Sequence, residues 1–298
     1  MKLAAIDIGS NASRLLICEV ITDSYGNPIF NKLNLVRVPL RLGFDVFETG
    51  HIGKQRTGMV IQTMKAYQHL LNVYDVQHIK ACATSAMRDA TNSNDIIRKV
   101  KMETGIEIEI LSGDTEANMI YENHIAESLD KEHSYLYIDV GGGSTELTFF
   151  ADGKLRYKES FNIGTIRLLK RQVTDAHWDE MKEHLKSNTK SKHPMIAIGS
   201  GGNINKVFSL SKKKDGKPLS FDLLKDYYKE LSSVSVPQRM EMYKLREDRA
   251  DVIVPALQIY TNVMRWADIE TIYVPKIGLA DGLIRSLHEE VKHLHIHA

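Results

Sequence analysis

Two segments that are far apart in the chain follow the same plan. KLAAIDIGSNASRLLI (residues 2–17) and YLYIDVGGGSTELTFF (residues 135–150) each hold an apolar run, an Asp at its end, a Gly-containing turn and a second apolar run. The two acids, Asp7 and Asp139, lie 132 positions apart (139 − 7). This period is too long for a solenoid repeat and predicts a duplicated domain. The alternative is a pair of unrelated hairpins that both use glycine.

Segments typical of strands alternate with helical patterns along the chain, which predicts an α/β fold. Strands are expected at 2–7, 14–21, 34–38, 78–84, 106–111, 135–139, 146–150, 154–161, 194–200 and 271–275. Helices are expected at 53–74, from 92–95 onward, and at 115–128, 175–189, 221–232, 249–267 and 279–294. Together with the duplication, this order predicts two related α/β domains that meet at a cleft, with a boundary near residues 123–130.

The turn in the second segment contains more glycine than a hairpin requires. One glycine can supply the positive φ of a tight turn, yet Gly141, Gly142 and Gly143 follow one another. Successive residues without side chains let backbone N–H groups converge on an anion, and the hydroxyls of Ser144 and Thr145 add donors. The run therefore indicates a phosphate-binding turn.

Two other turns favour the same interpretation. Gly9, Ser10 and Asn11 occupy the matching place in the first segment, and GSGGN, which includes Gly201 and Gly202, lies between a predicted strand and a predicted helix. A helix N-terminus of this kind attracts anions. None of the three turns matches the P-loop or the dinucleotide-binding fingerprint, so three ordinary tight turns are the alternative.

Acids stand beside these turns. Asp7, Asp139 and Glu146 are candidate ligands of a hydrated Mg²⁺ or Mn²⁺, because magnesium takes few carboxylates and keeps waters that meet phosphate oxygens. The alternative is that each acid bonds nearby backbone amides, as turn residues often do.

ILSGDTEANMIY (residues 110–121) supplies a separate acid, Glu116. Ser112, Asp114 or Thr115 can cap a helix here, and Glu116 would then be only an acid in its first turn. The functional interpretation is a base that orients and deprotonates an attacking water. The pattern alone leaves both open.

Composition points away from several classes of partner. Lys and Arg (39) balance Asp and Glu (38), so no overall field favours nucleic acid or a membrane surface. Cys18 and Cys82 lie in apolar runs, which does not support a disulfide framework. The start lacks the long apolar core of a signal peptide, and no apolar run reaches the roughly 18–20 residues of a membrane helix. We expect a cytoplasmic protein that binds neither nucleic acid nor membrane.

The chain resembles the exopolyphosphatase and guanosine pentaphosphate phosphatase (Ppx/GppA) family, within the superfamily of actin-like proteins, sugar kinases and heat-shock chaperones. The resemblance rests on the segments AAIDIGSNASRLLI, RLGFDVFETGHI, CATSAMRDATN, IEILSGDTEA, YIDVGGGSTEL, AIGSGGN, REDRADVIVPA and IGLADGLI, which follow in the family's order and cover nearly the whole chain.

The resemblance implies two ribonuclease-H-like domains with a cleft between them. The first would be residues 1–125 with a returning C-terminal helix, 279–298, and the second would be residues 126–278. The implied activity is an exopolyphosphatase that releases terminal orthophosphate from inorganic polyphosphate by metal-assisted attack of water. Hydrolysis of guanosine pentaphosphate or of another nucleotide, a kinase of the same superfamily and a non-catalytic alarmone-binding sensor are the alternatives. A homodimer is left open.

The resemblance also assigns roles to residues. Glu116 matches the second acid of the family's S-G-x-E-E-A segment and would be the base, while Asp139 and Glu146 match acids of the catalytic cleft. Arg88 matches the arginine of A-T-x-A-x-R, also expected in the catalytic group. Gly9 to Asn11 and Gly141 to Ser144 would cradle phosphates.

The chain departs from the family's pattern at four positions: Thr115 replaces an acid, Ala12 a Ser, Asn203 a common Thr, and Ala256 a common Gly. The first two departures bear on affinity and metal stoichiometry.

A polyphosphate chain would need a basic track. Two groups are candidates: SKKKDGKP, with Lys212, Lys213, Lys214 and Lys217, and the cluster of Arg167, Lys170 and Arg171. Solvated surface charge is the alternative for both.

Overall fold

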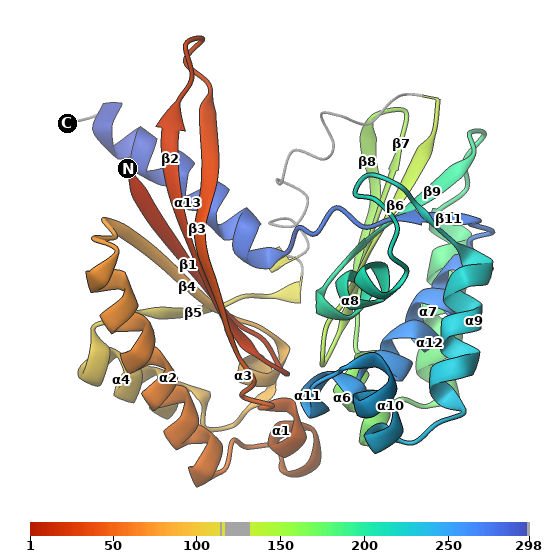
Figure 1. Cartoon of the computed structure of the whole chain (residues 1–298), viewed down its shortest axis with the longest axis horizontal. Coiled ribbons are helices and arrows are strands. Elements are labelled where there is room, and N and C mark those ends of the chain that lie inside the picture. Colours follow the sequence, from red (N-terminus) through yellow and green to blue (C-terminus); the bar gives the residue numbers. More distant parts are fainter. Residues whose placement is uncertain (114, 117–131, 297–298) are drawn as a thin grey trace. The chain divides into compact units, whose positions relative to one another are not determined.

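The computed structural model describes residues 1–113, 115–116 and 132–296 (Figure 1). The chain divides into two compact units, Met1–Asn123 with Leu279–Ala298 and His124–Gly278. The boundary predicted near residue 125 and most of the helix predicted at 115–128 lie outside the described residues. No helix within those ranges is long and apolar enough to cross a membrane.

The first unit is built on a five-stranded sheet of order β3-β2-β1-β4-β5. Its strands are β1 (Lys2–Ile8), β2 (Ser13–Thr22), β3 (Pro28–Val38), β4 (His78–Ala83) and β5 (Ile108–Ile110). Its helices are α1 (Gly43–Thr49), α2 (Lys54–Val73), α3 (Ser85–Asp89), α4 (Ser93–Thr104) and α13 (Leu279–Ile296). β1, β2 and β3 are antiparallel, whereas β4 and β5 continue the sheet in parallel with β1.

Helix α13 belongs to the core of this first unit, although it follows the second unit in sequence (Figure 1). Its buried Leu283, Ile284 and Val291 share one hydrophobic cluster with Leu3 of β1 and Leu16 of β2. The spacing of these helix residues places them on one face, as an amphipathic helix on a sheet requires.

The second unit is built on a six-stranded sheet of order β10-β11-β9-β6-β7-β8. Its strands are β6 (Ser134–Val140), β7 (Thr145–Ala151), β8 (Lys154–Phe161), β9 (Met195–Ser200), β10 (Leu219–Ser220) and β11 (Thr271–Tyr273). Its helices are α6 (Thr165–Leu169), α7 (Asp175–Asn188), α8 (Gly202–Leu210), α9 (Phe221–Ser232), α10 (Val236–Tyr243), α11 (Glu247–Ala250) and α12 (Ile253–Trp266).

The two sheets share one strand order. β8-β7-β6-β9-β11 in the second unit repeats β3-β2-β1-β4-β5 of the first, with three antiparallel strands followed by two parallel ones. The leading turns also match, because Gly9 N–H donates to the Ala12 carbonyl at 3.0 Å and Gly141 N–H to the Ser144 carbonyl at 2.9 Å. The duplication predicted from the sequence is therefore confirmed in the topology.

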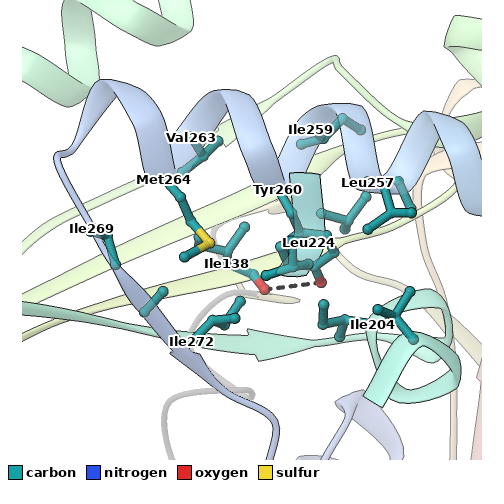
Figure 2. Close-up of a cluster of buried hydrophobic side chains, with 14 of the residues drawn as sticks. Ile138, Ile204, Leu224, Leu257, Ile259, Tyr260, Val263, Met264, Ile269 and Ile272 are labelled. Atoms are coloured by element: carbon teal, nitrogen blue, oxygen red, sulfur yellow. Dashed lines mark hydrogen bonds between the residues drawn. The ribbon is translucent and has the colours of Figure 1, made fainter. Parts of the chain in front are cut away.

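Tyr260 of α12 fixes the ends of β6 and β9. Figure 2 shows its side chain among Ile138, Ile204 and other apolar residues of the second core. Its buried hydroxyl donates to the carbonyls of Ser200 and Ile138, the latter at 3.4 Å. Burial raises the pKa of this phenol well above its usual value, so the hydroxyl stays a donor. Asp139 and Gly201 each follow one of these anchored residues.

The helix predicted at 249–267 is in fact two helices, α11 and α12. Pro255 lies in the first turn of α12, where its missing N–H has no intrahelical partner to lose. A helix that ran through residues 251–252 would instead require that hydrogen bond, so the prediction of one continuous helix was wrong.

Candidate functional site

The triglycine turn between β6 and β7 is held by its carbonyl groups. Thr165 N–H donates to the Gly141 carbonyl at 3.1 Å and Ile166 N–H to the Gly142 carbonyl at 2.8 Å. In a planar trans peptide the C=O and the following N–H point in opposite directions. The amides of Gly142 and Gly143 are therefore turned away from α6, which is the arrangement that an anion-binding turn needs.

The hydroxyl of Thr145 has a structural partner. It is fully buried and donates to the Ile163 carbonyl at 2.6 Å, which ties the end of the turn to the segment before α6. Phosphate binding by Thr145 stays a prediction. A phosphate would have to contact this hydroxyl while its hydrogen is donated to the Ile163 carbonyl. Ser144 is also buried.

Asp139 and Glu146 lie directly opposite each other in the register of β6 and β7. Their side chains are therefore on the same side of the strand pair, with Cβ atoms roughly 5 Å apart. Glu146 is 3% exposed and accepts a hydrogen bond from Ser160 Oγ at 2.9 Å. Like charges opposed in this way destabilise a sheet unless a cation lies near.

The matching place in the first unit is occupied differently. Asp7 is opposed by Arg14 on β2, and Arg14 Nη1 lies 2.7 Å from Asp7 Oδ2. The chain thus supplies its own cation to Asp7. Metal binding by Asp7 stays a prediction and competes with this ion pair.

The donor set of Asp139 and Glu146 fits Mg²⁺ or Mn²⁺. Magnesium is usually held by one or two carboxylates and completes its shell with water and substrate phosphate. Within the described ranges there is no group of three or more His, Cys, Asp or Glu side chains that could enclose a metal ion. Both observations agree with a site in which two carboxylates hold the metal ion and substrate phosphate completes its coordination shell.

Hydrogen bonds to its carbonyls also hold the turn of the first unit, residues 9–11. Gly43 N–H donates to the Ser10 carbonyl and Arg41 N–H to the Asn11 carbonyl, both at 2.9 Å. The Ser10 hydroxyl lies 2.8 Å from Ser85 Oγ and accepts from Ala86 N–H at 3.1 Å. This hydroxyl therefore secures the start of α3. Phosphate binding by Gly9, Ser10 and Asn11 stays a prediction that rests mainly on their backbone amides.

The structure brings Glu116 and Arg88 together. Glu116 is 8% exposed, and its Oε2 lies 3.8 Å from Arg88 Nη1, which also donates to the Leu111 carbonyl at 2.8 Å. Ser112 caps the turn, since its Oγ accepts from Thr115 N–H at 3.1 Å. Asp114, another of the three proposed caps, lies outside the described residues.

The GSGGN turn adjoins an arginine that sequence reasoning did not select. Arg249 Nη1 donates to Asn203 Oδ1 at 2.8 Å and lies 2.7 Å from where a Cβ on Gly202 would be. Gly201, at φ +106°, is the N-cap residue of α8. The guanidinium and the helix N-terminus together make a positively charged place for an anion. The REDRADVIVPA segment contained the signal, but nothing in it specified Asn203 as the partner.

The two basic groups lie at different distances from these turns. Residues 212–217 follow the C-terminal end of α8, which is a nine-residue helix. At a rise of 1.5 Å per residue, this end of the helix is about 13 Å from the N-terminal end, where the GSGGN turn lies. Arg167 instead contacts the triglycine turn directly, with Nε 2.7 Å from the Gly143 carbonyl. Within the second unit, Arg167 of α6 therefore lies beside the predicted phosphate site.

Known proteins resemble the chain over nearly its whole length. The model of the Ppx/GppA phosphatase family matches residues 23–291. A bifunctional 3-dehydroquinate synthase/phosphatase of Fusobacterium nucleatum is 30% identical over 248 residues, which span 80% of this chain but only 35% of that protein. Exopolyphosphatase 1 of Mycobacterium tuberculosis is 24% identical over 311 residues, spanning 97% of this chain and 89% of the relative.

Solved structures confirm the predicted fold class of two ribonuclease-H-like, actin-like domains. The Ppx/GppA family member of Aquifex aeolicus superposes with a TM-score of 0.75 at 26% identity and covers 98% of both chains. An exopolyphosphatase of Cytophaga hutchinsonii superposes with a TM-score of 0.81 at 22% identity, covering 97% of this chain and 98% of that one.

Proposed function

Because the chain belongs to the Ppx/GppA phosphatase family, we propose that it is a phosphohydrolase that releases terminal orthophosphate from inorganic polyphosphate by attack of water. The observation that carries this proposal is the combination, in one hairpin, of a turn that presents its amides and two opposed carboxylates, Asp139 and Glu146. The exopolyphosphatases among the relatives favour polyphosphate as the substrate.

Phosphoryl transfer depends mainly on positioning and on stabilisation of charge. In the proposed mechanism the amides of the triglycine turn bind the terminal phosphate. Asp139 and Glu146 would hold Mg²⁺ or Mn²⁺, and the ion would supply positive charge for phosphate binding. Arg249 and the N-terminus of α8 offer a further place for anionic oxygens. These groups bind and orient the substrate without covalent chemistry.

Glu116 is the proposed base. Its carboxylate is buried and is oriented by Arg88. The carboxylate can therefore orient the attacking water and accept a proton from that water. A loose transition state asks little of this base, which is why a carboxylate suffices. Thr115, in place of an acid, leaves Glu116 to act without an acidic neighbour.

The test is release of orthophosphate from polyphosphate, guanosine pentaphosphate and ATP, measured side by side with the purified protein in Mg²⁺ and in Mn²⁺. Polyphosphate should be hydrolysed fastest, and Glu116→Gln should lower the release at least about a hundredfold. Hydrolysis confined to guanosine pentaphosphate would move the assignment to that substrate. ATP consumption that requires an added sugar or carboxylate would identify a kinase, and binding of guanosine pentaphosphate without turnover would identify a sensor.

A further inference from the structure

Arg167 makes a side-chain contact to the triglycine turn that the catalytic proposal does not use. Its Nε donates to the Gly143 carbonyl at 2.7 Å, while its own N–H lies 3.4 Å from the Gly142 carbonyl. With the bonds from Thr165 and Ile166, the carbonyls of all three glycines accept hydrogen bonds from residues 165–167. The third of these bonds comes from a side chain.

This bond determines where the next amide points. Holding the Gly143 carbonyl toward Arg167 turns the N–H of Ser144 to the opposite side of the same peptide plane. The amides of residues 142–144 then follow one another on the side away from α6. A charged donor on a carbonyl also polarises the peptide, which strengthens the N–H as a donor.

The segment before α6 approaches the turn backbone to backbone. A Cβ on Gly164 would lie 2.5 Å from the carbonyl oxygen of Gly142 and closer still to the carbonyl carbon of Gly143. Real side chains do not tolerate such contacts, so only glycine permits this approach. The Thr145 hydroxyl also joins the end of the turn to this segment, because it donates to the Ile163 carbonyl.

The first unit holds its turn with backbone groups. There, the amides of Arg41 and Gly43 bond the carbonyls of Asn11 and Ser10, and the Arg41 guanidinium lies over the Phe44 ring, 4.0 Å from its centroid. In the second-unit turn, beside the two opposed carboxylates, an arginine side chain also donates to a glycine carbonyl.

We propose that Arg167 is a positioning residue of the phosphate-binding turn, which fixes the Ser144 amide toward the anion through its Nε–H bond to the Gly143 carbonyl. The inference rests on the proposed function of this turn. This role differs from that of the basic track for the polyphosphate chain, for which Arg167 is also a candidate. Because the amides stabilise charge that grows in the transition state, loss of the bond should lower kcat more than it changes KM.

Two substitutions separate the hydrogen bond from the charge. In Arg167→Gln, the side-chain amide nitrogen is attached to Cδ as Nε is, so a neutral donor remains in place. Arg167→Met has a similar length and no donor. Arg265→Met removes an exposed arginine of α12 in the same unit and controls for net charge.

We expect Arg167→Met to lower kcat at least about tenfold with KM within about threefold, by analogy with loss of a single aligned donor. Arg167→Gln should recover most of kcat, and Arg265→Met should match the wild type. Equal losses in the Gln and Met variants would assign Arg167 to substrate charge and overturn the inference, as would an unaffected Met variant.

A second measurement does not require turnover. Titration of the ¹⁵N-labelled protein with orthophosphate should shift the Ser144 amide resonance in the wild type and in Arg167→Gln, but much less in Arg167→Met. A wild-type protein that binds orthophosphate at Ser144 yet hydrolyses none of the three substrates would refute the proposed function and leave the positioning role intact. A Ser144 shift that is the same in all variants would refute the positioning role alone.

Discussion

Glu146 lies directly opposite Asp139, whereas Arg14 lies opposite Asp7 at the matching place in the first unit. The duplicated hairpins have thus diverged in the sign of one cross-strand partner. In the first unit the two partners carry opposite charges, and in the second they carry like charges. Like charges that face each other across a strand pair repel, and a divalent cation bound between them would reduce that repulsion.

This repulsion predicts that Glu146→Gln stabilises the metal-free protein. The expected gain is about 0.2–1 kcal/mol in the free energy of unfolding, since the Gln oxygen can still accept from Ser160 Oγ. Mg²⁺ should raise the Tm of the wild type but not that of the variant, while phosphate release falls at least about a hundredfold. Urea titrations with and without Mg²⁺ measure the first two effects, and a less stable variant would argue against repulsion.

Glu116→Gln is predicted to leave the fold intact and to lower kcat at least about a hundredfold, because a proton acceptor is lost without a change of shape. The Gln oxygen can take the place of Glu116 Oε2, which lies 3.8 Å from Arg88 Nη1. Steady-state rates of phosphate release and the thermal unfolding curve should be measured on the same preparation. A variant with near-normal turnover would remove Glu116 from the mechanism.

Gly164→Ala is predicted to destabilise the second unit by about 1–3 kcal/mol, the usual range for overpacking, because its Cβ would overlap the triglycine backbone. Gly58→Ala is the matched control. Gly58 lies inside α2 with nothing within 4 Å of the added Cβ, so alanine should stabilise by about 0.5–1 kcal/mol. Denaturant unfolding measures the free energy of unfolding of both variants. A Gly164→Ala variant as stable as the wild type would disprove the close approach of the two backbones.

Much of the fold could be predicted from the sequence, because strand and turn patterns are local. The opposition of Asp139 and Glu146 follows from a hairpin whose four-residue turn is Gly141–Ser144. Arg167 and Arg249 could not be assigned in this way. Their partners, Gly143 and Asn203, are 24 and 46 residues distant, and helical or strand periodicity does not specify contacts over such separations.

Burial raises the pKa of the Cys82 thiol to about 12, with the carboxylate of Glu109 acting in the same direction. In the unfolded chain this thiol ionises near its ordinary pKa of 9.0, so the unfolded state releases a proton above that pH while the folded state keeps it. Stability contributed by Cys82 is complete below pH 9 and is lost as the pH rises toward 12.

The free energy of unfolding should therefore fall less steeply above pH 9 in Cys82→Ala than in the wild type. Urea titrations at several pH values between 8 and roughly 11 give the two slopes. Identical slopes would mean that the thiol is not protected in the folded state. Cys18, whose pKa burial raises to about 11, should show the same behaviour over a narrower range.

The position of α13 has a consequence for biosynthesis. The ribosome delivers residues 132–278 before the residues of α13, so the second unit can complete its core while the first still lacks Leu283, Ile284 and Val291. The surface of the first-unit sheet around Leu3 and Leu16 would then stay uncovered until α13 has been synthesised. The usual N-to-C order of domain folding is thus reversed here, because the first unit begins the chain but completes its core after the second unit. We therefore expect the first unit to be the main contact of a chaperone that binds nascent chains.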